Sequence, residues 1–196
     1  MIVAIANQKG GAGKSATALN LCEHMSPQLI VDADVHMGIS KLLQLSDRED
    51  FSVIQPARIG ELEVINKYER VIIDCGGFDS DITRRALVMA DVIITPSSDD
   101  PQDQFALMAF NEVLAFESKK NGRDIVANVL INRVHPSRRN FDEMSELVSS
   151  LSHLRLLPIV IPTSSLIPKA AFSGRGVQNG QVAAKFSQLS KLINTI

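Results

Sequence analysis

Short apolar segments alternate with segments of helical periodicity along the whole chain. The apolar segments are continuous and rich in Val and Ile, which is typical of strands covered on both faces. They predict strands at Ile2–Ala6, Leu29–Asp32, Ser52–Gln55, Val71–Asp74, Val92–Thr95, Ile125–Ile131 and Leu156–Ile161. The segments between and after them predict helices at Lys14–Met25, Gly38–Leu45, Ile59–Lys67, Asp79–Met89, Gln102–Lys119, Ser137–Leu151 and Val182–Ile193. This alternation predicts an α/β fold, a doubly wound and mostly parallel sheet with helices on both faces.

The composition is that of an ordinary globular protein, with 45% hydrophobic and 21% charged residues. The sequence contains no repeat, low-complexity tract or long linker, so we expect a single domain over residues 1–196. Its apolar runs are far shorter than the roughly 20 residues of a membrane span, and its first residues are typical of a buried strand rather than a secretion signal. The two cysteines, Cys22 and Cys75, suit a reducing cytoplasm, where we expect the protein to be.

The charge is unevenly distributed, because residues 1–100 are net acidic and residues 101–196 are net basic. One interpretation is a chance scatter of charges over solvated faces. The other is a basic surface in the second half of the chain, which would suit a polyanionic partner.

A glycine-rich segment at residues 7–15 joins the first predicted strand to the first predicted helix. Its glycines allow a tight turn that directs consecutive N–H groups at an anion, and the helix N-terminus favours negative charge at the same place. Lys14 would then reach the β- and γ-phosphates of a nucleotide, and the Ser15 hydroxyl would bind Mg²⁺. The usual motif has a glycine where this chain has Gln8, and a second lysine, Lys9, stands at the start of the loop.

The segment Lys9–Ser15 resembles the deviant Walker A motif of the ParA/MinD family of P-loop ATPases, and is closest to the small ParA-type partition ATPases. The resemblance extends over nearly the whole chain and implies the P-loop NTPase fold, with ATP or ADP and Mg²⁺ as cofactors. It assigns phosphate binding to Gly10, Gly11, Ala12, Gly13, Lys14, Ser15 and Ala16. In this family the extra lysine crosses a nucleotide-sandwich dimer, a role that falls on Lys9. A charge supplied in this way is worth roughly 10³–10⁵ in rate.

Acidic residues end two further predicted strands. Asp32 and Asp34 lie two residues apart, hence on the same side of their strand, and Asp74 ends an apolar strand in the Walker B arrangement. The resemblance implies that Asp34 positions the attacking water and that Asp32 and Asp74 hold Mg²⁺ through water. Alternatively, the first two acids cap the next helix. Where the family has Pro-Gln-Gly, this chain has Val-His-Met at residues 35–37, and where the family has Pro-Pro it has Gly-Gly at residues 76–77. The two glycines predict that the segment after Asp74, which would sense the γ-phosphate, is looser than in most of the family.

Two positions late in the chain match the base-binding region of ParA-like proteins. Asn132 ends a buried strand, and the resemblance implies that it binds adenine; alternatively it is an ordinary loop residue. Pro162, after the last predicted strand, would flank the base. ParA-like proteins also bind DNA without sequence preference, through basic residues late in the chain. The candidates here are Arg138, Arg139, Lys169 and Arg175. Alternatively, these residues are merely solvated charges.

The resemblance therefore implies an ATPase whose ATP-bound homodimer binds non-specific DNA in the nucleoid and segregates a plasmid or chromosome, or positions another cargo. Hydrolysis is expected to be slow until a ParB-like or other adaptor stimulates it. One alternative is a MinD-like ATPase that binds membrane through the amphipathic stretch 182–196, although this stretch has few basic residues and is more typical of a helix covering the sheet. A biosynthetic enzyme of the dethiobiotin-synthetase type is a further alternative, but it would not need Lys9.

Overall fold

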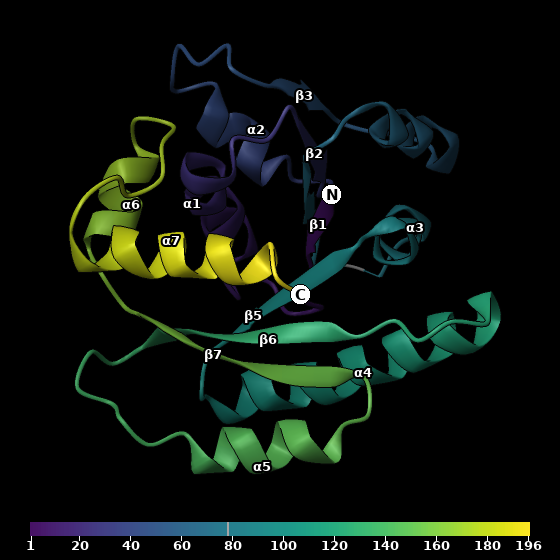
Figure 1. Cartoon of the computed structure of the whole chain (residues 1–196), viewed down its shortest axis with the longest axis vertical. Helices are drawn as coiled ribbons and strands as arrows, with labels where there is room; N and C mark the ends of the chain where they lie inside the picture. Colours follow the sequence, from purple (N-terminus) through teal and green to yellow (C-terminus); the bar gives the residue numbers. More distant parts are fainter. Residues whose placement is uncertain (78) are drawn as a thin grey trace.

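The computed structural model describes residues 1–77 and 79–196 and contains one seven-stranded sheet (Figure 1). The strand order is β3-β2-β4-β1-β5-β6-β7, and every neighbouring pair is parallel. The strands are β1 (Ile2–Ile5), β2 (Leu29–Ala33), β3 (Ser52–Ile54), β4 (Val71–Cys75), β5 (Val92–Ser97), β6 (Ala127–Val134) and β7 (Leu154–Pro162). The predicted doubly wound sheet is thus confirmed, and it is entirely parallel.

Helices cover both faces of the sheet. They are α1 (Lys14–Met25), α2 (Gly38–Leu43), the 3₁₀ helix η1 (Ile59–Lys67), α3 (Asp81–Met89), α4 (Pro101–Asn121), α5 (Asp142–Ser150), α6 (Leu166–Ala171) and α7 (Gly180–Ile193). One apolar cluster joins η1, α3, α4 and α5 to the sheet, and a second joins α1, α2 and α7 to its other face. In Figure 1 these two groups of helices lie on opposite sides of the strands.

Successive side chains of the central strands enter the two clusters in turn. In β1, Val3 and Ile5 pack in the cluster with α1, whereas Ala4 packs in the cluster with α4. In β4, Val71 and Ile73 share the cluster with Ala4. Because both faces are buried, the strands have no polar side, which is why they are continuous apolar runs in the sequence.

Two predicted helices differ clearly from the structure, and one helix was not predicted. The helix expected over Ser137–Leu151 begins only at Asp142, because the Asn140 side chain accepts the N–H of Asp142 at 2.7 Å and residues 135–141 form a loop. The segment Ile59–Lys67 is a 3₁₀ helix, consistent with its glycine and its β-branched residues, which disfavour an α-helix. The short helix α6 was not predicted. It is only six residues long, and its Ile167, Ala170 and Ala171 are only partly buried, so its apolar pattern is too short to detect.

The last helix, α7, packs its apolar face onto the molecule. Val182, Phe186, Leu189 and Ile193 are all buried in the cluster shared with α1 and β7. The interpretation of this stretch as a helix that covers the sheet is confirmed. In the part of the chain that the structure describes, every helix is too short or too polar to cross a membrane.

Candidate functional site

The loop that joins β1 to α1 lies at the carboxyl edge of the sheet, where ligands bind in folds of this kind. Gly11 and Gly13 have left-handed backbones, with φ of 76° and 96°. A Cβ on Gly13 would lie 2.5 Å from the Asn132 amide nitrogen, so only glycine fits there. A cavity of about 470 Å³ opens on the loop and is lined by seven residues of the predicted site, together with His36 and Gly77, which were not predicted as site residues. The seven are Gly10, Gly11, Gly13, Lys14, Ser15, Ala16 and Asp34. Ala12 is buried behind it.

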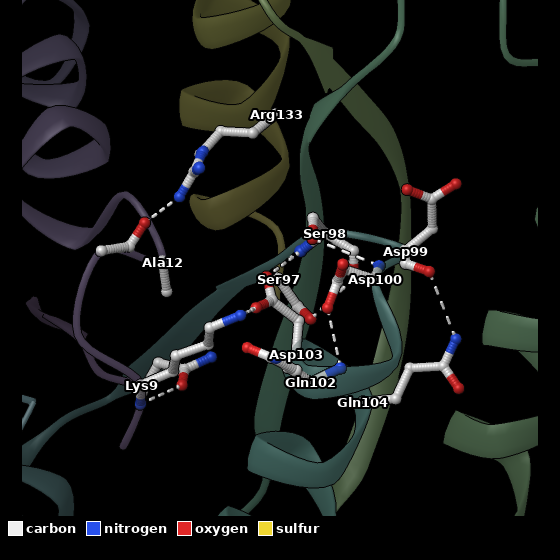
Figure 2. Close-up of polar contacts among 12 residues, drawn as sticks. Lys9, Ala12, Ser97, Ser98, Asp99, Asp100, Gln102, Asp103, Gln104 and Arg133 are labelled. Atoms are coloured by element: carbon white, nitrogen blue, oxygen red, sulfur yellow. Dashed lines mark hydrogen bonds and ion pairs between the residues drawn. The ribbon is translucent and has the colours of Figure 1, made fainter.

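Lys9, the first lysine of the glycine-rich loop, is fixed by contacts to its own chain. The Asn7 side chain accepts the Lys9 N–H at 2.8 Å, and the Lys9 ammonium group forms an ion pair with Asp103 near the start of α4 (Figure 2). The Asp103 side chain is only 4% exposed, and its second oxygen accepts the Ser98 N–H at 2.8 Å. Burial raises the pKa of Asp103, but the hydrogen bonds from Lys9 and Ser98 outweigh it, so this pKa lies below its ordinary value.

The second loop lysine, Lys14, is the first residue of α1 and is largely buried. Its ammonium group donates to the Lys9 carbonyl at 3.0 Å. Burial lowers the pKa of Lys14, while the negative charges of Asp74 and Asp34 act in the opposite direction. A buried ammonium group beside a glycine-rich loop is well placed to receive a phosphate, which would replace the water that it has lost.

The two acids at the end of β2 have different surroundings. One oxygen of Asp32 accepts the Asp34 N–H at 3.1 Å, and the other accepts the Ser40 N–H in α2 at 2.9 Å. Asp32 therefore holds the loop before α2 and the start of that helix, as the capping alternative predicts. Asp34 lines the cavity, with one oxygen accepting the His36 N–H at 2.9 Å.

Asp74, at the end of β4, lies beside Asp32 in the sheet register and is fully buried. Among the described residues, neither of its carboxylate oxygens has a hydrogen-bond partner of normal geometry. Burial raises the pKa of Asp74 to about 7; the nearby Ser15 hydroxyl lowers it, and the charge of Asp32 raises it. A buried carboxylate without a partner, close to a serine hydroxyl and a second carboxylate, is a donor set that fits Mg²⁺. Ser15, Asp32 and Asp74 are the residues that would hold such an ion.

Gly76 and Gly77, which follow β4, pack closely against neighbouring backbone. A Cβ on Gly77 would lie 3.3 Å from the Gly10 nitrogen, and one on Gly76 would lie 3.3 Å from the Cα of Asp34. Small residues at 76 and 77 thus permit close backbone approach between β4, β2 and the phosphate loop. Residue 78 lies outside the described residues.

Asn132 and Arg133, at the end of β6, both contact the glycine-rich loop. The Asn132 amide donates to the Ala12 carbonyl at 3.3 Å, and the Arg133 guanidinium donates to the Gly11 carbonyl. Pro162 ends β7 and pairs in register with Val134. Arg133 and Asp103 were not predicted as site residues. A charged side chain next to a strand-end asparagine, and an acid in the first turn after β5, are the signals that could have found them.

The four DNA-binding candidates fall into two groups. Arg138 and Arg139 lie in the loop before α5; Arg138 pairs with Asp99 at 3.1 Å, and Arg139 donates to the Pro136 carbonyl. Both line a cavity of about 460 Å³ together with Lys185 of α7. Lys169 is in α6, and Arg175 follows α6 in a loop whose Gly174 packs against α2. The structure therefore joins the first two candidates to Lys185 and places the other two elsewhere.

A glycine-rich loop with two lysines joins the first strand of a parallel sheet to the first helix, and a buried acid lies on the neighbouring strand. This arrangement defines a phosphate-loop nucleotide-binding protein. The sequence profile of the CobQ/CobB/MinD/ParA nucleotide-binding domain matches residues 3–177. The chain belongs to this family.

Individual relatives agree with this assignment. Protein ParA of Rhizobium radiobacter is 24% identical over 155 residues, which cover 72% of this chain and 68% of the relative. A Borrelia burgdorferi B31 protein assigned to plasmid partition, solved with AMPPNP, superposes with a TM-score of 0.73 at 17% identity, over 100% of this chain and 99% of that one. The septum site-determining protein MinD of Pyrococcus horikoshii OT3, solved with Mg-ADP, gives 0.71 at 19% identity, over 98% and 95%. These likenesses establish the shared fold.

Proposed function

We propose that the protein is a ParA-type ATPase of a single domain, which binds ATP or ADP with Mg²⁺ and forms a sandwich homodimer when ATP is bound. The observation that carries the proposal is the phosphate loop with both Lys9 and Lys14, set between β1 and α1 in a chain of the ParA-containing family. Hydrolysis is slow in the isolated protein, and a ParB-like or other adaptor stimulates it.

The residues around the cavity have different roles in hydrolysis. Lys14 and the loop N–H groups bind the phosphates, and Asp34, which lines the same cavity, orients the attacking water. When bound, Mg²⁺ neutralises phosphate charge, and Ser15, Asp32 and Asp74 hold it directly or through water. We assign adenine binding to Asn132, which contacts the phosphate loop, and to Pro162.

Lys9 makes hydrolysis depend on dimerisation. Its ammonium group must leave Asp103 of its own chain to reach the phosphates bound by a second subunit. A monomer keeps this pair and lacks the added positive charge, which supports a slow basal rate.

The basic residues of the second half serve non-specific DNA binding. Arg138 and Arg139 lie beside Lys185, and a dimer carries two such groups, with Lys169 and Arg175 as a second basic region on each subunit. In the ATP state we place the protein on nucleoid DNA in the cytoplasm, where it segregates a plasmid or chromosome or positions another cargo. The burial of the apolar face of α7 favours this function over membrane binding.

Nucleotide binding and mass, measured together, test the proposal. Calorimetry should show that the wild-type protein binds Mg-ATP and Mg-ADP, and that Lys14→Ala binds neither. Light scattering after size exclusion should show an ATP-dependent dimer that Asp34→Ala stabilises because it does not hydrolyse ATP. Lys9→Ala should bind ATP and remain largely monomeric. A monomeric Asp34→Ala protein saturated with ATP would contradict the proposal.

A further inference from the structure

Arg133 has a backbone conformation that is unfavourable for a residue with a side chain. Its φ is 61°, in the left-handed region, at a point where the pairing of β6 with β7 shifts register. Thr163 fixes this irregularity: its hydroxyl donates to the Arg133 carbonyl and its N–H to the Val134 carbonyl, both at 2.8 Å. Irregularities of this kind redirect a side chain, and backbone strain held in place by hydrogen bonds is a reason to look for a function.

The redirected side chain reaches the phosphate loop. The Arg133 guanidinium donates to the Gly11 carbonyl, and its Cδ passes 3.5 Å from the point where a Cβ on Gly13 would lie. The neighbouring Asn132 amide holds the next carbonyl, that of Ala12, at 3.3 Å. Figure 2 shows Arg133 extending across to the loop that contains Ala12. Two consecutive residues of β6 thus hold two consecutive carbonyls of the loop.

Because a peptide group is planar, these contacts also set the direction of the N–H groups in the loop. In a trans peptide the C=O and N–H bonds point in opposite directions, so fixing a carbonyl also fixes the N–H of the next residue. With the Gly11 and Ala12 carbonyls held toward β6, the N–H groups of Ala12 and Gly13 point away from β6. Glycine backbones rotate easily, and a rotated Gly11 peptide would direct an oxygen, instead of an N–H, at a phosphate.

We propose that Arg133 is a positioning residue, which holds the Gly11 carbonyl so that the N–H groups of the loop stay directed at the phosphates of the nucleotide. The inference rests on the proposed nucleotide-binding function. Among the described residues, Arg133 forms no ion pair with a carboxylate, so its positive charge also remains available to attract the polyphosphate.

Binding of Mg-ATP and of Mg-tripolyphosphate, measured by calorimetry, tests the proposal, because the second ligand has phosphates and no base. Arg133→Ala should bind both ligands about tenfold more weakly, the range expected for one charge-assisted hydrogen bond. Arg133→Lys, which can still donate to the Gly11 carbonyl, should stay within about threefold of the wild type. Arg123→Ala is the matched control, since Arg123 is also exposed and donates to a backbone carbonyl, that of Val88, away from the loop.

Arg133→Gly separates the effect of the backbone strain from the effect of losing the side chain. Arg133→Gly relieves the left-handed strain, so it should unfold at a temperature no lower than Arg133→Ala, yet bind tripolyphosphate equally weakly. Wild-type affinity for tripolyphosphate in either variant would overturn the proposal. This includes the case in which only ATP binding is weakened, because the arginine would then act on the base. If the wild-type protein itself bound no Mg-ATP, the proposed function would fail instead.

Discussion

Lys9 and Asp103 form an ion pair that joins the phosphate loop to the N-terminal turn of α4 within one chain. The carboxylate is buried and also accepts the Ser98 N–H, so it has a fixed position, whereas the lysine is partly exposed. The same lysine is the one that the proposed dimer needs at the phosphates of a second subunit. In the proposed dimer, the intrachain pair would therefore compete with dimerisation, and only molecules in which it is broken would be competent to form the active site.

Weakening this pair should make dimerisation easier. Asp103→Asn removes the charge attraction for Lys9 but keeps an oxygen for the Ser98 N–H, so we expect the fold to persist. In an Asp34→Ala background with ATP, sedimentation should give half-maximal dimer at a protein concentration several-fold lower, corresponding to about 1 kcal/mol. Asp100→Asn is the control, because Asp100 caps the same helix and accepts the Gln102 N–H. Equal dimerisation of the Asp103→Asn and Asp100→Asn proteins would refute the competition.

The buried Asp74 should make the stability of the metal-free protein depend on pH. Its pKa is about 7 in the folded protein, above the ordinary value of 3.8, so the folded state binds the extra proton between these values. The stability it contributes is present at low pH and is lost as the pH rises through about 7. Asp74→Asn should therefore stabilise the protein against denaturant at both pH values, by about 2–3 kcal/mol more at pH 8.5 than at pH 5. An equal effect of the substitution at both pH values would show that Asp74 is not buried in this way.

The two basic groups can be separated by the salt dependence of DNA binding. Each lysine or arginine that contacts a DNA phosphate adds about 0.9 to the slope of log affinity against log salt. Arg139→Ala and Lys185→Ala should each make the slope less steep by about twice that amount in the ATP state, because each substitution removes two contacts from a dimer. Lys169→Ala and Arg175→Ala test the second group in the same way. Arg155→Ala, on the exposed side of the edge strand β7, should leave the slope unchanged. If none of the four substitutions changed the slope, DNA would bind elsewhere or not at all.

The terminal helix should behave as part of the core. Phe186 is among the largest fully buried side chains, so Phe186→Ala should lower the free energy of unfolding by about 3–5 kcal/mol. Phe105→Ala is the comparison, since Phe105 is 68% exposed on α4 and its loss should cost less than about 0.5 kcal/mol. A small loss from Phe186→Ala would indicate that α7 is free to leave the sheet, as a membrane-binding helix must.

Most of the fold could be predicted because its central strands are buried on both faces, which gives continuous apolar runs with recognisable ends. The helix predicted over Lys14–Met25 has those same bounds in the structure. The predicted start of α5 was wrong because the Asn140 side chain sets the true start, and α6 was missed because it is only six residues long and has no fully buried side chain. Both depend on contacts that hydrophobic periodicity does not record.

The candidate site could be predicted where function constrains consecutive residues, as in the loop with Lys9 and Lys14. It could not be predicted where residues distant in the sequence meet. Asp103 reaches Lys9 from 94 positions away, and Arg133 reaches Gly11 from 122 positions away. Asp32 illustrates an intermediate case, because its position at the strand end was expected while its hydrogen bond to Ser40 required the structure. The roles assigned to these residues in hydrolysis stay predictions.

Binding to non-specific double-stranded DNA, measured with ATP, with ADP and without nucleotide at two salt concentrations, tests the central claim most directly. The account predicts binding only with ATP, weaker at the higher salt, and strengthened in Asp34→Ala because that variant retains its ATP. A protein that forms its ATP dimer and yet does not bind DNA at either salt concentration would contradict the account.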